Sequence, residues 1–185
     1  MALSRERVIG TAVDLLRRYG LGDLSMRRLA RELGVAPGAL YWHISNKQEL
    51  LVEVADALLS EVPEIAGDRP AAEALAALAL AIREAIAPVP DGADVVALAY
   101  AVEPAAARPL REVSRLLAAA GVPVAERDHV AALVVHHILG SVGGQQDRAR
   151  AAAVDPELPV PDATGESKAF EIGMGVIVRG LAAYR

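Results

Sequence analysis

Apolar residues recur every three or four positions along most of this chain, which is the period of an amphipathic helix. Near the N-terminus they fall at Val8, Ala12, Leu15, Leu16 and Tyr19. This spacing predicts a first helix with one buried face. Ser4 can cap the start of that helix, and Gly20 can adopt the left-handed turn that often follows a helix end.

Two shorter helices are predicted next. One opens at Ser25 and stops at Gly34, and a very short one covers residues 39–43. Two short helices joined by a tight turn that contains glycine are typical of a helix-turn-helix unit. Asn46, followed three residues later by Glu49, predicts a capping box at the start of a fourth helix that continues to about residue 63.

The rest of the chain predicts longer helices separated by proline and glycine. The patterns place them at 71–87, at 93–102, from Pro104 to about Ala120, at 126–150 and at 166–184, with a proline-rich loop over 153–163. The helix over 126–150 is apolar on most sides and should be buried on both flanks. With the last helix, it suggests a four-helix dimer interface. The predicted fold class is therefore all-α, with a helix-turn-helix head at 1–63 and a larger helical body at 64–185.

Glycines inside the last two predicted helices need a reason, because each costs up to about 1 kcal/mol relative to alanine in a helix. They are Gly140, Gly143, Gly144, Gly173, Gly175 and Gly180. We expect them to let neighbouring helices approach closely.

Composition narrows the class of protein. The 185 residues are 54% hydrophobic and only 3% aromatic, so alanine, leucine and valine carry the apolar content. No apolar run approaches the roughly 18 residues of a membrane span, and the charged N-terminus does not resemble a secretory signal. We therefore expect a cytoplasmic protein with no membrane partner. The absence of cysteine excludes disulfides, thiolate nucleophiles and cysteine-ligated metals.

Charge is distributed unevenly along the chain. Residues 1–50 hold eight Lys and Arg against five acids, for a charge of +3, whereas residues 51–185 hold eleven against nineteen, for −8. A basic head on an acidic body is expected where one end meets phosphates. A chance fluctuation in solvated charge is the alternative.

The segment at 40–51, LYWHISNKQELL, is more specific than the spacing of the helices. It resembles the DNA-binding domain of the tetracycline-repressor (TetR) family, and the resemblance extends over residues 4–59. Residues 136–140, 170–174 and 179–181 resemble, more loosely, the last two helices of the same branch. The resemblance implies a homodimeric repressor that binds a palindromic double-stranded DNA operator and is released by a small-molecule effector.

The resemblance implies that Arg27 reaches into the major groove, where its guanidinium fork would match O6 and N7 of guanine. Contact with a phosphate, or plain solvation, is the alternative. Pro37, Gly38 and Ala39 open the recognition helix and offer no polar side chain. Base reading there would depend on thymine methyl groups or on close approach of the backbone.

Five further residues complete the predicted DNA-binding set: Ser25, Tyr41, Trp42, His43 and Lys47. The resemblance makes Tyr41 and Trp42 phosphate or groove contacts, although core packing is the usual fate of such rings. Lys47 would sit at a helix N-terminus, where a cation opposes the helix dipole. A DNA phosphate is the partner we expect for it.

An apolar effector pocket is predicted in the body. Its expected lining is Leu58, Val62, Ile82, Ile86, Val96, Tyr100, Leu116 and Leu117, with Arg83, Glu103 and His137 as polar members. Most of these would serve equally well as ordinary core. The effector expected from this lining is a small hydrophobic molecule, aromatic or polyketide-like.

We expect no metal and no cofactor. His129 and His136 are seven residues apart, about 10 Å along a helix, which is too far to share one ion unaided. Tetracycline repressors hold a magnesium–drug chelate through a histidine and a glutamate, and the corresponding places fall near Val96 and Gly144. Neither residue can bind a metal, so a magnesium–tetracycline effector is not expected.

Two other classes of function are less compatible with the sequence. A helical enzyme or binding protein for a small apolar molecule would need unrecognised chemistry, because the chain has no phosphate-binding glycine loop, nucleophile elbow or HExxH motif. A non-specific architectural DNA protein is disfavoured by the acidic net charge of −5. A gel shift on the DNA upstream of the coding sequence, with its salt dependence, would separate the three.

Overall fold

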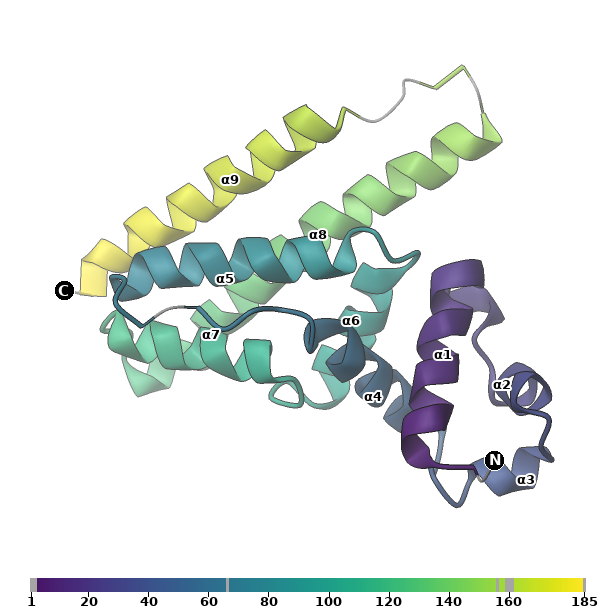
Figure 1. Ribbon diagram of the computed structural model, residues 1–185. Helices are drawn as coiled ribbons and strands as arrows, with labels where there is room; N and C mark the ends of the chain where they lie inside the picture. Colours follow the sequence, from purple (N-terminus) through teal and green to yellow (C-terminus); the bar gives the residue numbers. More distant parts are fainter. Residues whose placement is uncertain (1–2, 66, 156, 159–161, 185) are drawn as a thin grey trace.

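The computed structural model describes residues 3–65, 67–155, 157–158 and 162–184, and in these ranges the chain is helical with no strand (Figure 1). The helices are α1 (Arg5–Tyr19), α2 (Met26–Leu33), α3 (Pro37–Leu40), α4 (Lys47–Leu59), α5 (Ala71–Ile86), α6 (Gly92–Val102), α7 (Arg108–Ala119), α8 (Val124–Val154) and α9 (Ala163–Gly180), with 3-10 turns η1 (Leu21–Asp23) and η2 (Leu181–Tyr184). Figure 1 shows α1, α2 and α3 as a small head at one end, and α5 to α9 as the body at the other. The predicted all-α class is confirmed.

Helices α1 and α2 begin where the sequence predicts. Ser4 Oγ accepts the backbone N–H of Arg7 at the start of α1, and Ser25 Oγ accepts that of Arg28 at the start of α2, each at 3.2 Å. Gly34 ends α2 in the left-handed conformation. Gly20 differs from the prediction: it has a positive φ of 74° but an extended ψ of −179°, because the chain turns directly into η1.

Helix α4 connects the head to the body. Asn46 Oδ1 accepts the N–H of Glu49 at 2.8 Å, as predicted, but the Glu49 carboxylate accepts the N–H of Ser45, at 2.7 Å, rather than that of Asn46. The helix ends at Leu59 instead of running to residue 63. Because α4 packs against α1 of the head and α6 of the body, it belongs to both. The boundary at residue 63 stays a prediction.

The body helices depart from the predicted bounds at several places. Helix α7 begins at Arg108, with Pro109 in its first turn, because Pro104 lies in the turn that follows α6. Helix α8 continues to Val154, past the predicted start of the loop. Helix α9 begins at Ala163, where Asp162 Oδ1 accepts the N–H of Thr164 at 3.0 Å. Residues 156 and 159–161 of the predicted loop lie outside the described residues.

Two apolar positions are not buried as predicted. Tyr19 is half exposed at the end of α1, where its ring lies 4.1 Å under the guanidinium of Arg28. Leu133 of α8 is 54% exposed, so only one flank of that helix is covered within the chain. In the described ranges no helix is both long enough and apolar enough to cross a membrane.

Candidate DNA interface and effector pocket

The recognition segment presents two aromatic rings to solvent. Helix α3 is a single turn that ends at Leu40, and residues 41–43 continue as a turn rather than as the predicted helix. Leu40 and Ile44 are fully buried, as predicted, and they anchor the segment from inside. Tyr41 is half exposed and Trp42 is 89% exposed. Neither ring is packed in the core, so both are free to contact a partner.

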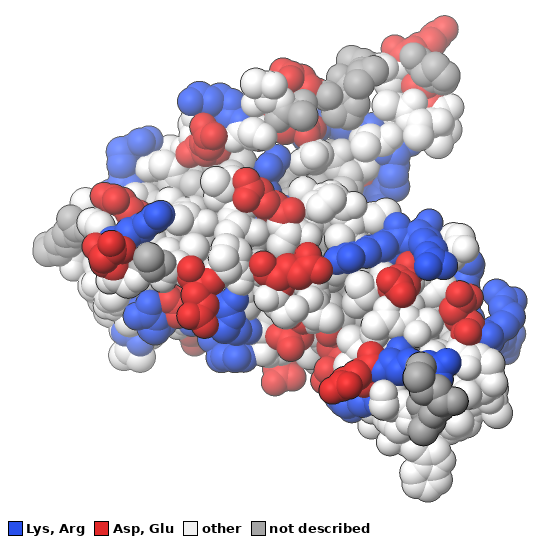
Figure 2. All heavy atoms as spheres, viewed as in Figure 1, with Lys and Arg blue, Asp and Glu red and all other residues white. Residues whose placement is uncertain are grey.

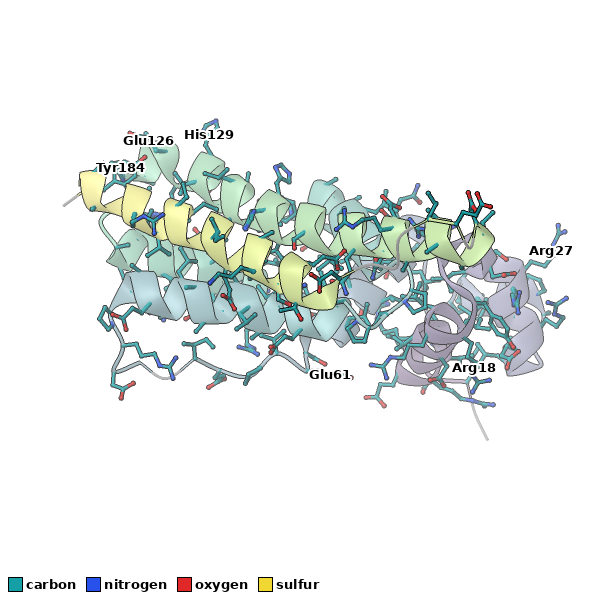
Figure 3. All side chains as sticks on the ribbon, turned by 90° about the horizontal axis from the view of Figure 1, so that it is seen from above. Arg18, Arg27, Glu61, Glu126, His129 and Tyr184 are labelled. Atoms are coloured by element: carbon teal, nitrogen blue, oxygen red, sulfur yellow. The ribbon has the colours of Figure 1, made fainter. Side chains whose placement is uncertain are left out.

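Arg27 is also free to contact a partner. It projects from the surface of the head in Figure 3, and no hydrogen-bond or ion-pair partner is found for it among the described residues. The next residue, Arg28, is different, because it pairs with Asp23. Ser25 is occupied as the acceptor of its capping bond, which leaves its hydroxyl hydrogen to donate.

The turn before α4 is held from its inner side. The Arg5 guanidinium donates to the carbonyl oxygen of His43 at 2.5 Å, to Glu49 at 2.8 Å and to Glu53 at 2.7 Å. The N–H of Ser45, and then Arg5, hold the pKa of Glu49 below its usual range. Lys47 lies exposed at the first position of α4. The inner side of the turn is therefore fixed while its outer side stays open.

Pro37 and Gly38 are exposed and Ala39 is half-buried at the start of α3. A Cβ atom at Gly38 would meet nothing within 4 Å. A partner molecule can therefore approach the protein backbone closely at this end of α3. In Figure 2 basic side chains border the outer edge of the head, while both charges are mixed over the body.

A second surface lies on α8 and α9, which run side by side (Figures 1 and 3). Leu133 of α8 and Ile172 and Val176 of α9 are each 54–57% exposed. Ile172 and Val176 are four residues apart, so they share one face of α9. Apolar side chains on two adjacent helices form the pattern of an interface between helices. We call these three residues the α8–α9 face.

The body contains a hollow of about 390 Å³ between the α6–α7 turn, α7 and α8. Its lining is Tyr100, Pro104, Ala105, Leu110, Arg111, Ser114, Asp128, Ala131 and Val135. The volume suits a small organic molecule. Burial, and then the charge of Asp128, raise the pKa of Tyr100, and its ring meets that of His136 edge-on at 6.2 Å. Arg111 donates to the carbonyl oxygens of Ala105 and Ala106, which fastens the rim.

Of the eleven predicted pocket residues, Tyr100 is the one in the lining of this hollow. The aliphatic members are packed in the hydrophobic core: Leu58, Val62, Ile82, Ile86, Val96, Leu116 and also Leu117. Glu103 is exposed at the end of α6. The sequence pattern missed the other lining residues because Pro104 and Ala105 lie in a turn, which has no helical periodicity, and the rest come from two separate helices, α7 and α8.

The two remaining polar candidates lie elsewhere, at the junction of α5, α8 and α9. Arg83 is 7% exposed, and its Nη2 donates to Gln145 at 3.0 Å. The ring of His137 stacks on that of Phe170 at 5.1 Å, and its Nε2 lies 3.1 Å from the Phe170 carbonyl oxygen. Both polar groups therefore serve packing between these three helices.

The two positions that correspond to the metal-binding residues of tetracycline repressors carry no side-chain ligand atoms. Val96 is fully buried, and Gly144 lies beside the guanidinium of Arg148. His129 points outward from α8 in Figure 3. In the described part of the chain, no three His, Cys, Asp or Glu side chains group as a metal site would require.

Comparisons with known proteins cover both parts of the chain. The family profile described as bacterial regulatory proteins, tetR family, matches residues 8–54. The class A tetracycline repressor protein from transposon 1721 of Escherichia coli is 32% identical, across 99% of this chain and 92% of the repressor. The crystal structure of Mycobacterium smegmatis BioQ superposes with a TM-score of 0.87 at 36% identity, covering 100% of both chains. BioQ bound to its double-stranded DNA operator gives 0.78 at 34% identity, over 98% of this chain and 99% of that one.

Proposed function

This chain belongs to the TetR family of bacterial regulatory proteins, and we propose that it is a dimeric transcriptional repressor whose head, residues 1–63, binds a palindromic operator. The body, residues 64–185, pairs two copies and receives a small, mostly apolar effector that releases the DNA. A regulator of this kind acts on chromosomal DNA in the cytoplasm. No catalytic role is proposed for any residue.

The observation that carries the proposal is the set of side chains left exposed on one end of the head. Trp42, Tyr41, Arg27 and Lys47 are all exposed. The turn that bears the two rings is anchored by the buried side chains of Leu40 and Ile44. A guanidinium can read guanine, a lysine ammonium can neutralise a phosphate, and aromatic rings can pack along a groove. These are the groups that a DNA-binding surface needs.

The body suggests how an effector would reach the head. Arg108 lies in the first turn of α7, next to the rim of the hollow, and its guanidinium donates to the carbonyl oxygen of Val62 just after α4. A ligand that shifts the rim therefore acts on the end of the helix that Lys47 begins. By thermodynamic linkage, a ligand that prefers the shifted state lowers operator affinity by the factor that it loses on DNA binding.

The first prediction distinguishes the two cationic DNA contacts. Arg27→Ala should weaken operator binding by about 1–3 kcal/mol per half-site and relax the preference at one base pair. Lys47→Ala should weaken binding to all sequences alike and reduce the salt slope by about one unit per contact. Gel shifts on operator and scrambled duplexes over a salt series measure both effects. Identical behaviour of the two variants would mean that Arg27 only clamps phosphate.

A second prediction tests the effector pocket. Ala105→Trp places a large ring at the rim of the hollow, so compounds that release wild-type protein from its operator should fail to release this variant. Ala101→Trp is the control, because Ala101 is exposed nearby but does not line the hollow. Operator release is measured with a panel of aromatic and polyketide-like molecules. Tetracycline with magnesium should not release the protein from its operator. If the compounds that release wild type also release the Ala105→Trp variant, the pocket lies elsewhere.

A further inference from the structure

One carboxylate joins the head directly to the body. Asp91 lies in the turn between α5 and α6, and its Oδ2 accepts the backbone N–H of Leu21, just beyond α1, at 2.8 Å. Its Oδ1 accepts a hydrogen bond from the guanidinium of Arg150 on α8. The Asp91 side chain is 19% exposed, so these bonds are partly shielded from water. The head is thereby connected to α8 by a path separate from α4.

The backbone of Asp91 is arranged for this contact. With φ 55° and ψ 20°, it is the one non-glycine residue with a positive φ in the described ranges. It also directly precedes α6, where an aspartate normally accepts an N–H of the first turn, yet it makes no such bond. A left-handed backbone is unfavourable for a residue with a Cβ atom. The contacts of the side chain and of its turn maintain the conformation.

The head is shaped to receive the carboxylate. A Cβ atom at Gly20 would lie 2.6 Å from Asp91 Oδ2, far inside van der Waals contact. Gly20 also has a positive φ of 74°. The glycine after α1 therefore serves two purposes: it turns the chain into η1, and it leaves space for Asp91 beside the N–H of Leu21.

The turn that bears Asp91 is fastened to α8. Gln146 Nε2 donates to the carbonyl oxygens of Ile86, Ala87 and Val89 at 3.4, 3.3 and 2.7 Å. Its Oε1 accepts the N–H of Ala93 at 3.4 Å. Arg150 follows one helical turn later, where it also pairs with Asp147. Helix α8 bears part of the α8–α9 face. These contacts therefore fix the position of the head relative to the helix through which two copies would pair.

We propose that Asp91 is a positioning residue for DNA binding, which fixes each head to α8 and so sets the separation of the two recognition segments in the dimer. The inference rests on the proposed function and adds a determinant of operator spacing to it. Without the Asp91 bond, α4 and its exposed ion pairs would hold the head. The head could then tilt, and the dimer would accept half-sites at altered separation.

The test compares how strongly each variant prefers the operator with the natural half-site separation over one with a longer separation. Asp91→Gly removes the carboxylate while suiting the left-handed backbone, so the fold is retained. Asp94→Ala is the matched control, because it removes a neighbouring, exposed acid whose carboxylate is 4.0 Å from Arg150. Each protein is measured on an operator that wild type selects from random duplexes, on the same operator with one base pair inserted between the half-sites, and on an isolated half-site. The insertion moves the half-sites apart by about 3.4 Å and about a tenth of a turn.

Wild type and Asp94→Ala should discriminate against the insertion by at least about tenfold, and Asp91→Gly by about threefold or less, with half-site affinity unchanged. Arg150→Ala should relax discrimination to a smaller degree, because the Leu21 bond survives. Equal discrimination by Asp91→Gly and wild type, or its absence in wild type, would overturn the inference. Failure of the proposed function is distinct, because wild type would then select no operator at all.

Discussion

Glutamates at Ile172 and Val176 together should convert the protein to a monomer and weaken operator binding by at least about 100-fold. Both side chains lie on the α8–α9 face, and pairing of two copies would bury two unpaired charges from each chain, which is strongly unfavourable. A dimer binds its second half-site at a high effective concentration, which raises affinity by about 10²–10⁴ over one half-site. Light scattering gives the mass, and gel shifts on full and half operators give the affinities.

The chain offers a closely matched control for this double variant. Leu98 and Val102 are also four residues apart, lie on α6 and are 47% and 58% exposed. Glutamates at these two positions change charge and apolar surface equally but lie outside the α8–α9 face. They should leave both the mass and the operator affinity near wild type. A dimeric Ile172→Glu, Val176→Glu variant would show that two copies pair through another surface.

The parts of the fold that depend on neighbouring residues could be predicted from the sequence. The capping of α2 by Ser25 and of α4 by Asn46 involves partners three residues away, so the local pattern is sufficient. The same holds for Leu40 and Ile44, whose spacing places them on one side of a short helical segment. The exposure of Trp42 follows from theirs, because the two inner positions leave the ring only the outer side.

The effector pocket and the Asp91 contact could not be predicted in this way. The hollow is lined by residues of a turn and of three helices, among them Pro104, Ser114 and Asp128, which no periodic pattern brings together. The Asp91 bond joins residues 70 positions apart in the sequence. Large aliphatic residues such as Ile82 instead fill the core, because their burial removes more apolar surface from water than that of alanine or serine.

Gly173→Ala should destabilise the protein although alanine is the better helix former. Its Cβ atom would lie 2.2 Å from Cε1 of His137, whose ring is held against Phe170 by stacking and by a contact to the Phe170 carbonyl oxygen. Overpacking of this kind costs about 1–3 kcal/mol, which exceeds the gain of up to about 1 kcal/mol from helix propensity. The glycine thus meets a side chain, rather than the neighbouring backbone that the sequence led us to expect. Denaturant unfolding at fixed protein concentration measures the change.

Two further variants separate the clash from the propensity. Gly10→Ala on α1, where a Cβ would meet nothing within 4 Å, should stabilise the protein by up to about 1 kcal/mol. In a His137→Ala background the clash is gone, so Gly173→Ala should reverse its sign and become stabilising as well. A Gly173→Ala protein as stable as Gly10→Ala, with His137 present, would show that α9 moves away from α8 without cost. In that case the imidazole would not set the spacing of the two helices that form the α8–α9 face.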